Sequence, residues 1–160
     1  MQYLSGEQEK EALYYLGVAA GIAKQSCCLR AKCGSIIVKD SAIIGEGFNS
    51  PPGNYPVDTC IKDILPENFP SDRTCCVHAE QRAIMNALRK YPNHLLNSRL
   101  YFIRLGEDDK VIKAGEPYCT ICSKMALDTA IKEFVLWHNE GIAVYDTEEY
   151  NRLSFQFKKE

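Results

Sequence analysis

The sequence predicts an α/β fold, namely a three-layer α/β/α sandwich around a mixed sheet of about five strands. First, helical and strand-like patterns follow one another in the order α-β-β-α-β-α-β-β-α. Second, two adjacent strand patterns predict a hairpin, which would give the sheet an antiparallel edge. Third, the chain has 160 residues, of which 46% are hydrophobic and 25% charged, so residues 1–160 are expected to form a single domain with one core.

The first half of the chain predicts one helix followed by the hairpin. Ser5-Gly6-Glu7-Gln8 has the spacing of a capping box, in which side chains pair with N–H groups at a helix start. Hydrophobic residues at helical intervals then predict a helix over residues 7–24. Residues 35–39 and 42–48 are rich in Ile and Val and are separated by the turn Asp40-Ser41, which predicts the hairpin. Residues 49–72 lack clear periodicity, and a stretch of that length is expected to cover a site.

The second half of the chain predicts alternating helices and strands. Ala79, Ala83 and Ala87 mark a helix that begins near His78 and ends before Tyr91-Pro92, because proline discourages continuation. The remaining expected elements are a strand over 99–105, a helix over 119–131, strands over 134–138 and 142–145, and a short helix after residue 146.

Charge and composition indicate a small-molecule ligand. The formal net charge is −2, whereas a protein that neutralises many phosphates of a polynucleotide needs a clustered basic surface. The sequence shows neither a secretory signal nor a stretch long and apolar enough to span a bilayer, so a cytoplasmic location is expected. In that reducing compartment the eight cysteines are expected to be thiols, metal ligands or core residues rather than disulfides.

The pattern that carries chemistry is His78-Ala79-Glu80 at one helix start together with Cys119-Thr120-Ile121-Cys122 at another. Two cysteines one turn apart can bind a single metal ion, and a helix N-terminus favours their thiolate form. The imidazole of His78 would be the third ligand. Three protein ligands on tetrahedral zinc leave the fourth position for water, which distinguishes a catalytic site from a structural one. We therefore expect one catalytic zinc ion on His78, Cys119 and Cys122.

Glu80 is the expected catalytic residue. A carboxylate beside the metal, but not bound to it, can accept a proton from a zinc-activated water and pass it to a substrate nitrogen. Inside a regular helix, residues two apart point about 200° away from each other. His78 and Glu80 can therefore face one zinc ion only if His78 lies at the very start of the helix, where the backbone is not yet helical.

These residues resemble the zinc-dependent cytidine and deoxycytidylate deaminases, whose signature is H-x-E followed by P-C-x-x-C. Two further segments extend the resemblance to the deoxycytidylate deaminases: Cys28-Leu29-Arg30 followed by Gly34-Ser35-Ile36-Ile37-Val38, and Gly47-Phe48-Asn49-Ser50-Pro51. The resemblance implies a cytidine deaminase-like fold, a homo-oligomer, and hydrolytic deamination of a cytosine nucleotide or nucleoside, with deoxycytidylate as the first guess. It also implies that Asn49 contacts sugar or base, that the backbone at Ala79 holds the pyrimidine, and that Arg30 approaches a 5′-phosphate.

The sequence departs from the family pattern at two positions. Tyr118 stands between Pro117 and Cys119, where the family has proline directly before the cysteine, and Arg82 follows the H-A-E motif where the family has asparagine. Both changes leave the core chemistry in place. They bear on substrate choice, because Tyr118 can narrow the pocket and Arg82 can either contact a phosphate or lie on the helix surface.

Several alternatives remain open at this point. Cys75 or Cys76 could close a structural zinc site, the C-x-x-C pair could be a redox motif, and Cys28, Cys60 and Cys76 could bind a second, structural ion, although we expect these cysteines to fill core space. The substrate could be another amino-heterocycle, such as guanine, a pterin-like base or an RNA nucleotide. A non-catalytic zinc-binding module is a third reading, against which Glu80 argues, because a structural site has no use for an unliganded carboxylate.

Overall fold

The structure is a computed structural model that describes residues 1–66 and 76–157. Within these residues, seven strands form one sheet in the order β1-β7-β6-β4-β2-β3, with β5 paired to β4. The strands are β1 (Gln2–Tyr3), β2 (Lys32–Lys39), β3 (Ala42–Phe48), β4 (Arg99–Leu105), β5 (Val111–Ile112), β6 (Glu133–Trp137) and β7 (Ile142–Asp146). β4 and β6 are parallel and the other paired strands are antiparallel, so the sheet is mixed as predicted.

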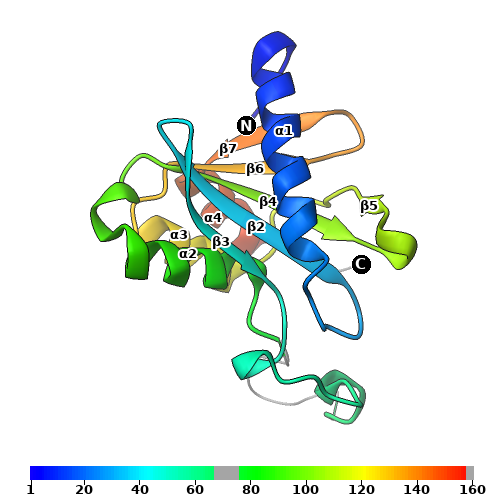
Figure 1. Cartoon of the computed structure of the whole chain (residues 1–160). Helices are drawn as coiled ribbons and strands as arrows, with labels where there is room; N and C mark the ends of the chain where they lie inside the picture. Colours follow the sequence, from blue (N-terminus) through cyan, green and yellow to red (C-terminus); the bar gives the residue numbers. More distant parts are fainter. Residues whose placement is uncertain (67–75, 158–160) are drawn as a thin grey trace.

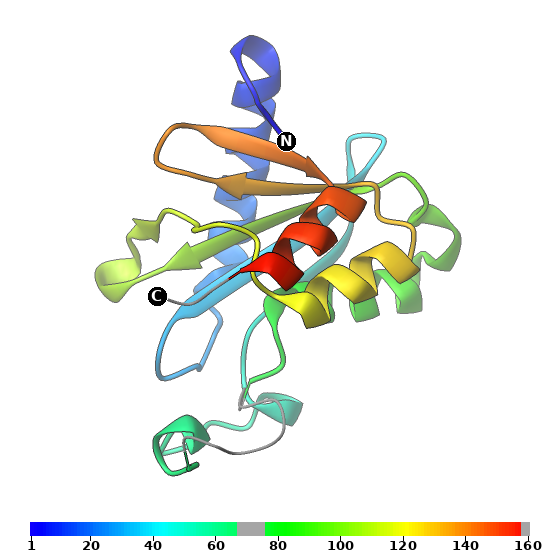
Figure 2. The ribbon, with the colours of Figure 1, turned by 180° about the vertical axis from the view of Figure 1, so that it is seen from behind.

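Helices cover both faces of the sheet. Helix α1 (Gly6–Ala23) lies on one face, and α2 (Ala79–Lys90), α3 (Thr120–Asp128) and α4 (Thr147–Gln156) lie on the other (Figure 1 and, from behind, Figure 2). Neighbouring residues of a strand serve opposite layers, since Ile36 packs in the cluster with α1 and Ile37 in the cluster with α2. The predicted three-layer α/β/α architecture is confirmed.

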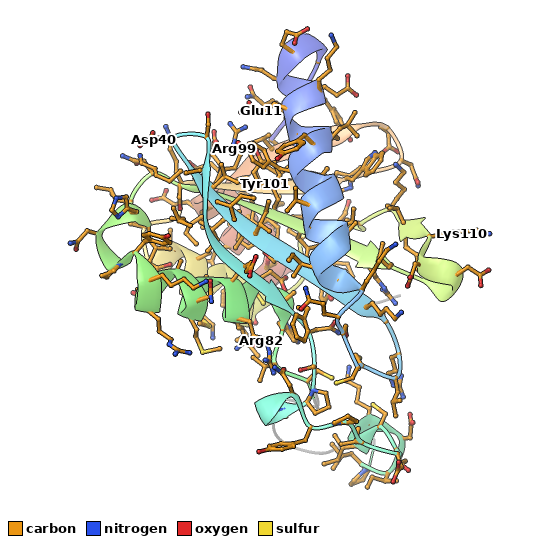
Figure 3. The ribbon with its side chains drawn as sticks, in the orientation of Figure 1. Glu11, Asp40, Arg82, Arg99, Tyr101 and Lys110 are labelled. Atoms are coloured by element: carbon orange, nitrogen blue, oxygen red, sulfur yellow. The ribbon has the colours of Figure 1, made fainter. Side chains whose placement is uncertain are left out.

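The predicted hairpin is present as β2 and β3. Asp40 and Ser41 form its turn with φ angles of 48° and 63°. Positive φ at both central residues is typical of the tight turns whose twist matches that of the flanking strands. Asp40 is labelled at the tip of the hairpin in Figure 3. The hairpin places β3 at one edge of the sheet, with the N-terminal end of α2 packed against it.

Two glycines of β3 allow α2 to approach the sheet closely. A Cβ atom at Gly47 would lie 2.5 Å from the carbonyl oxygen of Ala79 and 2.5 Å from the amide nitrogen of Ala83, and one at Gly45 would lie 2.5 Å from the carbonyl oxygen of Ala83. Such distances are far below van der Waals contact. The absence of side chains at Gly45 and Gly47 therefore sets the position of the first turn of α2.

The structure differs from the sequence-based expectations in a few details. Ser5 lies at the N-cap of α1, yet within the described residues its side chain makes no capping hydrogen bond, and the next residue, Gly6, has a φ of 62°. Helix α3 ends at Asp128 rather than 131, because Ala130 adopts a φ of 60° and turns the chain toward β6. Strands β1 and β5 have two residues each, too few to show a periodic pattern.

None of the helices in the described residues has the length and apolar character needed to span a lipid bilayer. The stretch 49–72 was expected to cover a site, and its residues 67–72 lie outside the described part of the chain. Residues 49–66 contain two short 3-10 helices, Pro52–Asn54 and Ile61–Asp63.

Candidate metal centre and active site

His78 lies at the N-cap of α2 in an extended conformation, with φ −69° and ψ 153°. Its backbone N–H donates a hydrogen bond of 2.9 Å to Oε1 of Gln81, which holds the first turn in place. This geometry confirms the inference that His78 precedes the regular helix. The side chain of Glu80, in the first turn, is 6% exposed and lines the same cavity as His78.

The two cysteines lie at the start of α3. Cys119 is the N-cap residue, with φ −86° and ψ 97°, and its Sγ atom accepts a hydrogen bond of 3.4 Å from the backbone N–H of Cys122. Both thiols are buried. The partial positive charge of a helix N-terminus stabilises a thiolate at this position.

The two helix starts bring three ligand atoms together. Nδ1 of His78 lies 3.2 Å from Sγ of Cys122 and 3.3 Å from Sγ of Cys119. All three ligand atoms lie within 4.8 Å of one another. One imidazole nitrogen and two cysteine sulfurs at these separations suit zinc, whereas magnesium and calcium prefer oxygen ligands. The residues present therefore fit a zinc ion.

The ionisation of the two thiols is coupled. Hydrogen bonds from Cys122 and His78 lower the pKa of Cys119 to about 4, although burial opposes this change. The pKa of Cys122 is raised, because it shares a proton with Cys119 and is buried. Since zinc binds both sulfurs as thiolates, zinc binding would release that proton.

Glu80 can exchange protons near neutral pH. Burial raises its pKa to about 7, and the neighbouring His78 opposes the increase. A carboxyl group with such a pKa can both accept and donate a proton at physiological pH, which is the requirement for a general acid and base. A buried carboxyl group therefore lies beside the three possible metal ligands, and its catalytic role stays a prediction.

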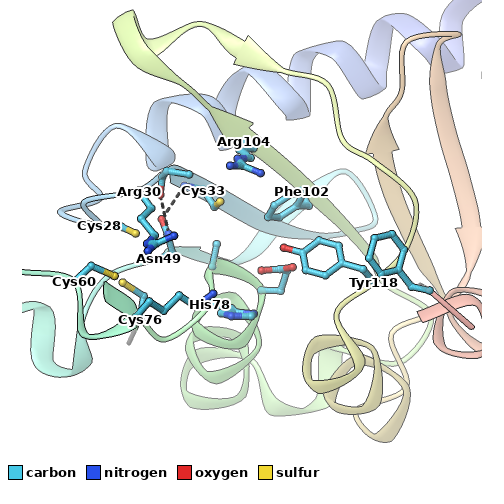
Figure 4. Close-up of a pocket in the computed structure, with 15 residues that line it drawn as sticks. Cys28, Arg30, Cys33, Asn49, Cys60, Cys76, His78, Phe102, Arg104 and Tyr118 are labelled. Atoms are coloured by element: carbon cyan, nitrogen blue, oxygen red, sulfur yellow. Dashed lines mark hydrogen bonds between the residues drawn. The ribbon is translucent and has the colours of Figure 1, made fainter. Parts of the chain in front are cut away.

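A cavity of about 830 Å³ opens next to these residues and is lined by all the remaining predicted substrate-binding residues, Arg30, Asn49 and Ala79 (Figure 4). Asn49 is held beside His78 by a backbone bridge, in which the N–H groups of Ser50 and Val77 each donate to the other's carbonyl oxygen, at 3.3 and 2.9 Å. The end of β3 and the start of α2 therefore form one wall of the cavity.

Most of the hydrogen-bonding capacity of Asn49 is used within the protein. Its Oδ1 atom accepts hydrogen bonds from Oγ of Ser26 at 2.8 Å and from the backbone N–H of Cys33 at 2.7 Å. Its Nδ2 atom donates to the carbonyl oxygen of Ala31 at 2.9 Å. An amide group carries two N–H donors, so one N–H remains for a ligand.

The two arginines that the sequence singled out are both engaged with other segments. Arg30 forms an ion pair with Asp63 of the second 3-10 helix, and both side chains are about half exposed. Arg82 donates to the carbonyl oxygens of Ser50 and Pro51 at 3.3 and 3.0 Å, and its guanidinium group lies over the ring of Phe48 (Figure 3). Arg82 thus fastens the loop after β3 and lines a second cavity of about 400 Å³.

Sequence reasoning missed several residues that line the main cavity. Phe102 and Arg104 come from β4, and Phe157 follows α4 and packs against Tyr118 with a ring-centroid distance of 5.7 Å. Lys62 reaches the cavity from the segment that we expected to cover a site. The alternation of residues along β4 places Leu100, Phe102 and Arg104 on the face covered by α2, and this signal could have identified Arg104.

The alternative of a second metal site, which we considered less favoured than cysteines that fill core space, receives no support from the described residues. Among them, His78, Cys119 and Cys122 form the one group of three possible ligands whose atoms lie close enough to share an ion. Cys28, Cys60 and Cys76 line the main cavity without forming such a group. Cys75, the alternative fourth ligand, lies outside the described residues.

Comparison with known proteins places this geometry in a family. Residues 9–138 match the model of the cytidine and deoxycytidylate deaminase zinc-binding region. The chain belongs to the cytidine and deoxycytidylate deaminase family. It is accordingly a zinc-dependent deaminase, in which His78, Cys119 and Cys122 can form the zinc site. The predicted family, cofactor and enzyme class are confirmed.

Relatives of this deaminase are deoxycytidylate deaminases. That of Mycobacterium phage D29 is 32% identical over 130 residues, which cover 76% of this chain and 90% of the relative. That of Saccharomyces cerevisiae is 27% identical over 127 residues, which cover 76% of this chain and 36% of the relative.

Two solved structures have a similar fold. The dCMP deaminase from the cyanophage S-TIM5, in complex with dCMP and dUMP, matches with a TM-score of 0.54 and 25% identity, covering 82% of both chains. The cytidine deaminase from Burkholderia pseudomallei matches with a TM-score of 0.57 and 14% identity, covering 86% of this chain and 94% of its own. The likeness to the second structure concerns the fold alone.

Proposed function

We propose that this deaminase hydrolyses deoxycytidine monophosphate (dCMP) to deoxyuridine monophosphate (dUMP) and releases ammonia. The observation that carries the proposal is the cavity of about 830 Å³, which is lined by His78 and Glu80 and also by the basic residues Arg30, Lys62 and Arg104. A base beside Glu80 and an anionic group beside a basic side chain would occupy it together. The relative from phage D29, a deoxycytidylate deaminase matched over 90% of its length, supports this substrate.

The cytosine ring is proposed to bind against the start of α2. Ala79 lines the cavity and is the first residue of α2, where a backbone N–H has no partner within the helix, so this N–H is available to hold the pyrimidine. The remaining N–H of Asn49 is available to sugar or base. Tyr118 is 56% exposed at the same cavity and, with Phe157, would limit the access of water once the ligand is bound.

The zinc ion, when bound, would lower the pKa of a water molecule so that it can act as a nucleophile at neutral pH. Glu80 accepts one proton from this water on its carboxylate and transfers it to N3 of the cytosine ring as the C4–oxygen bond forms. Glu80 then moves the second proton of the water to the exocyclic nitrogen. The C4–nitrogen bond breaks, ammonia leaves, and the C4 carbonyl of uracil remains.

Burial raises the pKa of Glu80 and the neighbouring His78 limits the increase, which prepares the carboxyl group for these proton transfers. Because burial raises the pKa of Glu80 to about 7, the carboxyl group neither holds its proton too tightly nor loses it too readily at physiological pH. Assembly into a homo-oligomer is proposed on the family resemblance, and light scattering after size-exclusion chromatography tests it. The cytoplasmic location stays a prediction from the sequence pattern.

The proposed activity is tested by ammonia release from purified, zinc-loaded protein. The substrates are dCMP, deoxycytidine and the corresponding adenine and guanine nucleotides and nucleosides. We expect the highest kcat/KM for dCMP. Release of ammonia from a guanine compound in preference to dCMP would overturn the substrate, and no release from any of them, in protein with one zinc per chain, would favour a non-catalytic zinc module.

A further inference from the structure

We propose that Arg104 binds the 5′-phosphate of the substrate and thereby determines the preference of the enzyme for a nucleotide over a nucleoside. This inference rests on the proposed function and names the specificity residue of the same site. Among the described residues, the basic side chains of Arg30, Lys62 and Arg104 line the cavity. Their surroundings distinguish them.

Arg104 is held at a fixed place in the sheet. It lies in β4, where its register partners are Cys33 of β2 and Ile112 of β5. Strand β4 is therefore hydrogen-bonded on both sides at this position. Leu100, four residues earlier on the same face of the strand, is buried under α2, whereas Arg104 is exposed and lines the cavity (Figure 4).

The charge of Arg104 is not neutralised within the described residues, where its guanidinium group forms neither an ion pair nor a side-chain hydrogen bond. Its cross-strand neighbour does not supply an anion either, because burial raises the pKa of the Cys33 thiol to about 12. A planar guanidinium group with free N–H donors suits the bidentate binding of a phosphate.

Arg30 and Lys62 are less suited to this role. Arg30 already pairs with Asp63, so a phosphate would have to compete with a carboxylate for its guanidinium group. Lys62 is exposed on a 3-10 helix of three residues. Its ammonium group is carried by a flexible side chain and lacks the planar pair of N–H donors that a guanidinium group offers to a phosphate. In this account Arg30 joins the segment before β2 to the segment 61–63, and Arg104 contacts the ligand.

The position of Arg104 also fits the direction in which a nucleotide would lie. His78 and Glu80 lie at the start of α2, and Asn49 lies between them and the residues before β2. Because the Oδ1 atom of Asn49 accepts from the backbone of Cys33, the register partner of Arg104, the three residues form a continuous wall. Glu80, Asn49 and Arg104 all line this cavity, so a ligand with its base at Glu80 can present its 5′-phosphate to Arg104 (Figure 4).

The test compares Arg104→Ala, Arg104→Lys, Arg30→Ala and Lys62→Ala in zinc-loaded protein. For each variant, kcat/KM is measured with dCMP and with deoxycytidine, and the Kd of dUMP and of deoxyuridine is measured by titration calorimetry. Loss of a charge-assisted contact corresponds to a decrease of about 10- to 100-fold. We expect Arg104→Ala to lower kcat/KM for dCMP and to weaken dUMP binding by this factor, with a much smaller effect on the nucleosides.

Arg104→Lys is expected to give an intermediate decrease in kcat/KM for dCMP, because the positive charge remains but the planar guanidinium group is lost. Arg30→Ala and Lys62→Ala are expected to change the ratio of dCMP to deoxycytidine turnover by no more than about fivefold, as for exposed ion pairs. Equal effects of Arg104→Ala on dCMP and deoxycytidine, or an unchanged Kd for dUMP, would overturn the inference, and a selective loss in Arg30→Ala would transfer the role to Arg30. A wild-type protein that deaminates neither compound would contradict the proposed function instead, and the dUMP titration would still test Arg104.

Discussion

Nδ1 of His78 lies 3.2 Å from Sγ of Cys122, although 44 positions separate the two residues in the sequence. His78 lies just before the first turn of α2, and Cys122 lies in the first turn of α3. Both helices pack on the same face of the sheet, so the sheet sets the distance between their starts (Figure 2). The metal site is therefore a product of the tertiary fold and should be lost when either helix start is altered.

We predict that His78→Ala lowers zinc content well below one ion per chain. Two thiolates would remain, and removal of a ligand from a three-residue site greatly weakens zinc binding. Zinc is measured by elemental analysis of protein purified without chelator. His94→Ala is the matched control, since His94 is exposed on the 3-10 helix Pro92–His94, away from the site. Full zinc content in the His78 variant would contradict the assigned ligand.

Glu80→Gln is expected to abolish turnover of dCMP while zinc remains bound. Glutamine keeps the size of glutamate but cannot carry a proton, and positioned acid–base catalysis contributes about 10²- to 10⁴-fold. Ammonia release and zinc content are measured on the same sample. Glu140→Gln, at an exposed turn residue, is the control. Retained turnover would refute the proton-transfer role, and loss of zinc would make Glu80 a fourth ligand.

The sequence predicted the elements and the metal ligands because both depend on local patterns. His78-Ala79-Glu80 and Cys119-x-x-Cys122 each combine a helix start with residues of known chemistry, and the spacing within each motif is visible in the chain. The conformation of His78 also followed, since a regular helix would have separated it from Glu80.

The remaining cavity wall depends on contacts between distant segments. The ion pair between Arg30 and Asp63 joins residues 33 positions apart, and the hydrogen bonds of Asn49 join three segments. No periodicity or motif indicates such partners. Arg104 is the last residue but one of a strand that alternates as expected, but which loop faces that end of the strand is decided only by the packing of the sheet.

Gly47→Ala is predicted to destabilise the protein and to weaken the metal site. The new Cβ atom would lie 2.5 Å from backbone atoms of Ala79 and Ala83, so α2 would have to move away from β3. Overpacking of this kind costs about 1–3 kcal/mol. The free energy of unfolding is measured by urea denaturation and zinc content by elemental analysis. Gly115→Ala is the matched control, because a Cβ atom there meets no atom within 4 Å. Equal stability of the two variants would contradict the close approach of α2.

Asn49→Ala is expected to affect both stability and substrate binding, and the two effects can be separated. The variant leaves the backbone N–H of Cys33 without its acceptor, which costs about 1–3 kcal/mol for a buried group, whereas the hydroxyl of Ser26 can still donate to the backbone carbonyl oxygen of residue 49. Asn49→Asp keeps this acceptor but replaces the Nδ2 donor, which bonds to the carbonyl oxygen of Ala31, by an oxygen atom. If the remaining N–H of Asn49 contacts the ligand, Asn49→Asp should raise the KM for dCMP by more than its loss of stability accounts for.

Urea denaturation and steady-state kinetics on the same preparations distinguish these outcomes, with Asn93→Ala, at an exposed residue, as the control. A structural role alone predicts that the decrease in kcat/KM follows the loss of stability in both variants. A ligand contact predicts that Asn49→Asp loses kcat/KM out of proportion to its stability. A carboxylate also faces the cavity in this variant and repels an anionic substrate, so the decrease should be larger for dCMP than for deoxycytidine. If Asn49→Asp keeps the wild-type KM for both compounds, Asn49 serves the wall of the cavity only.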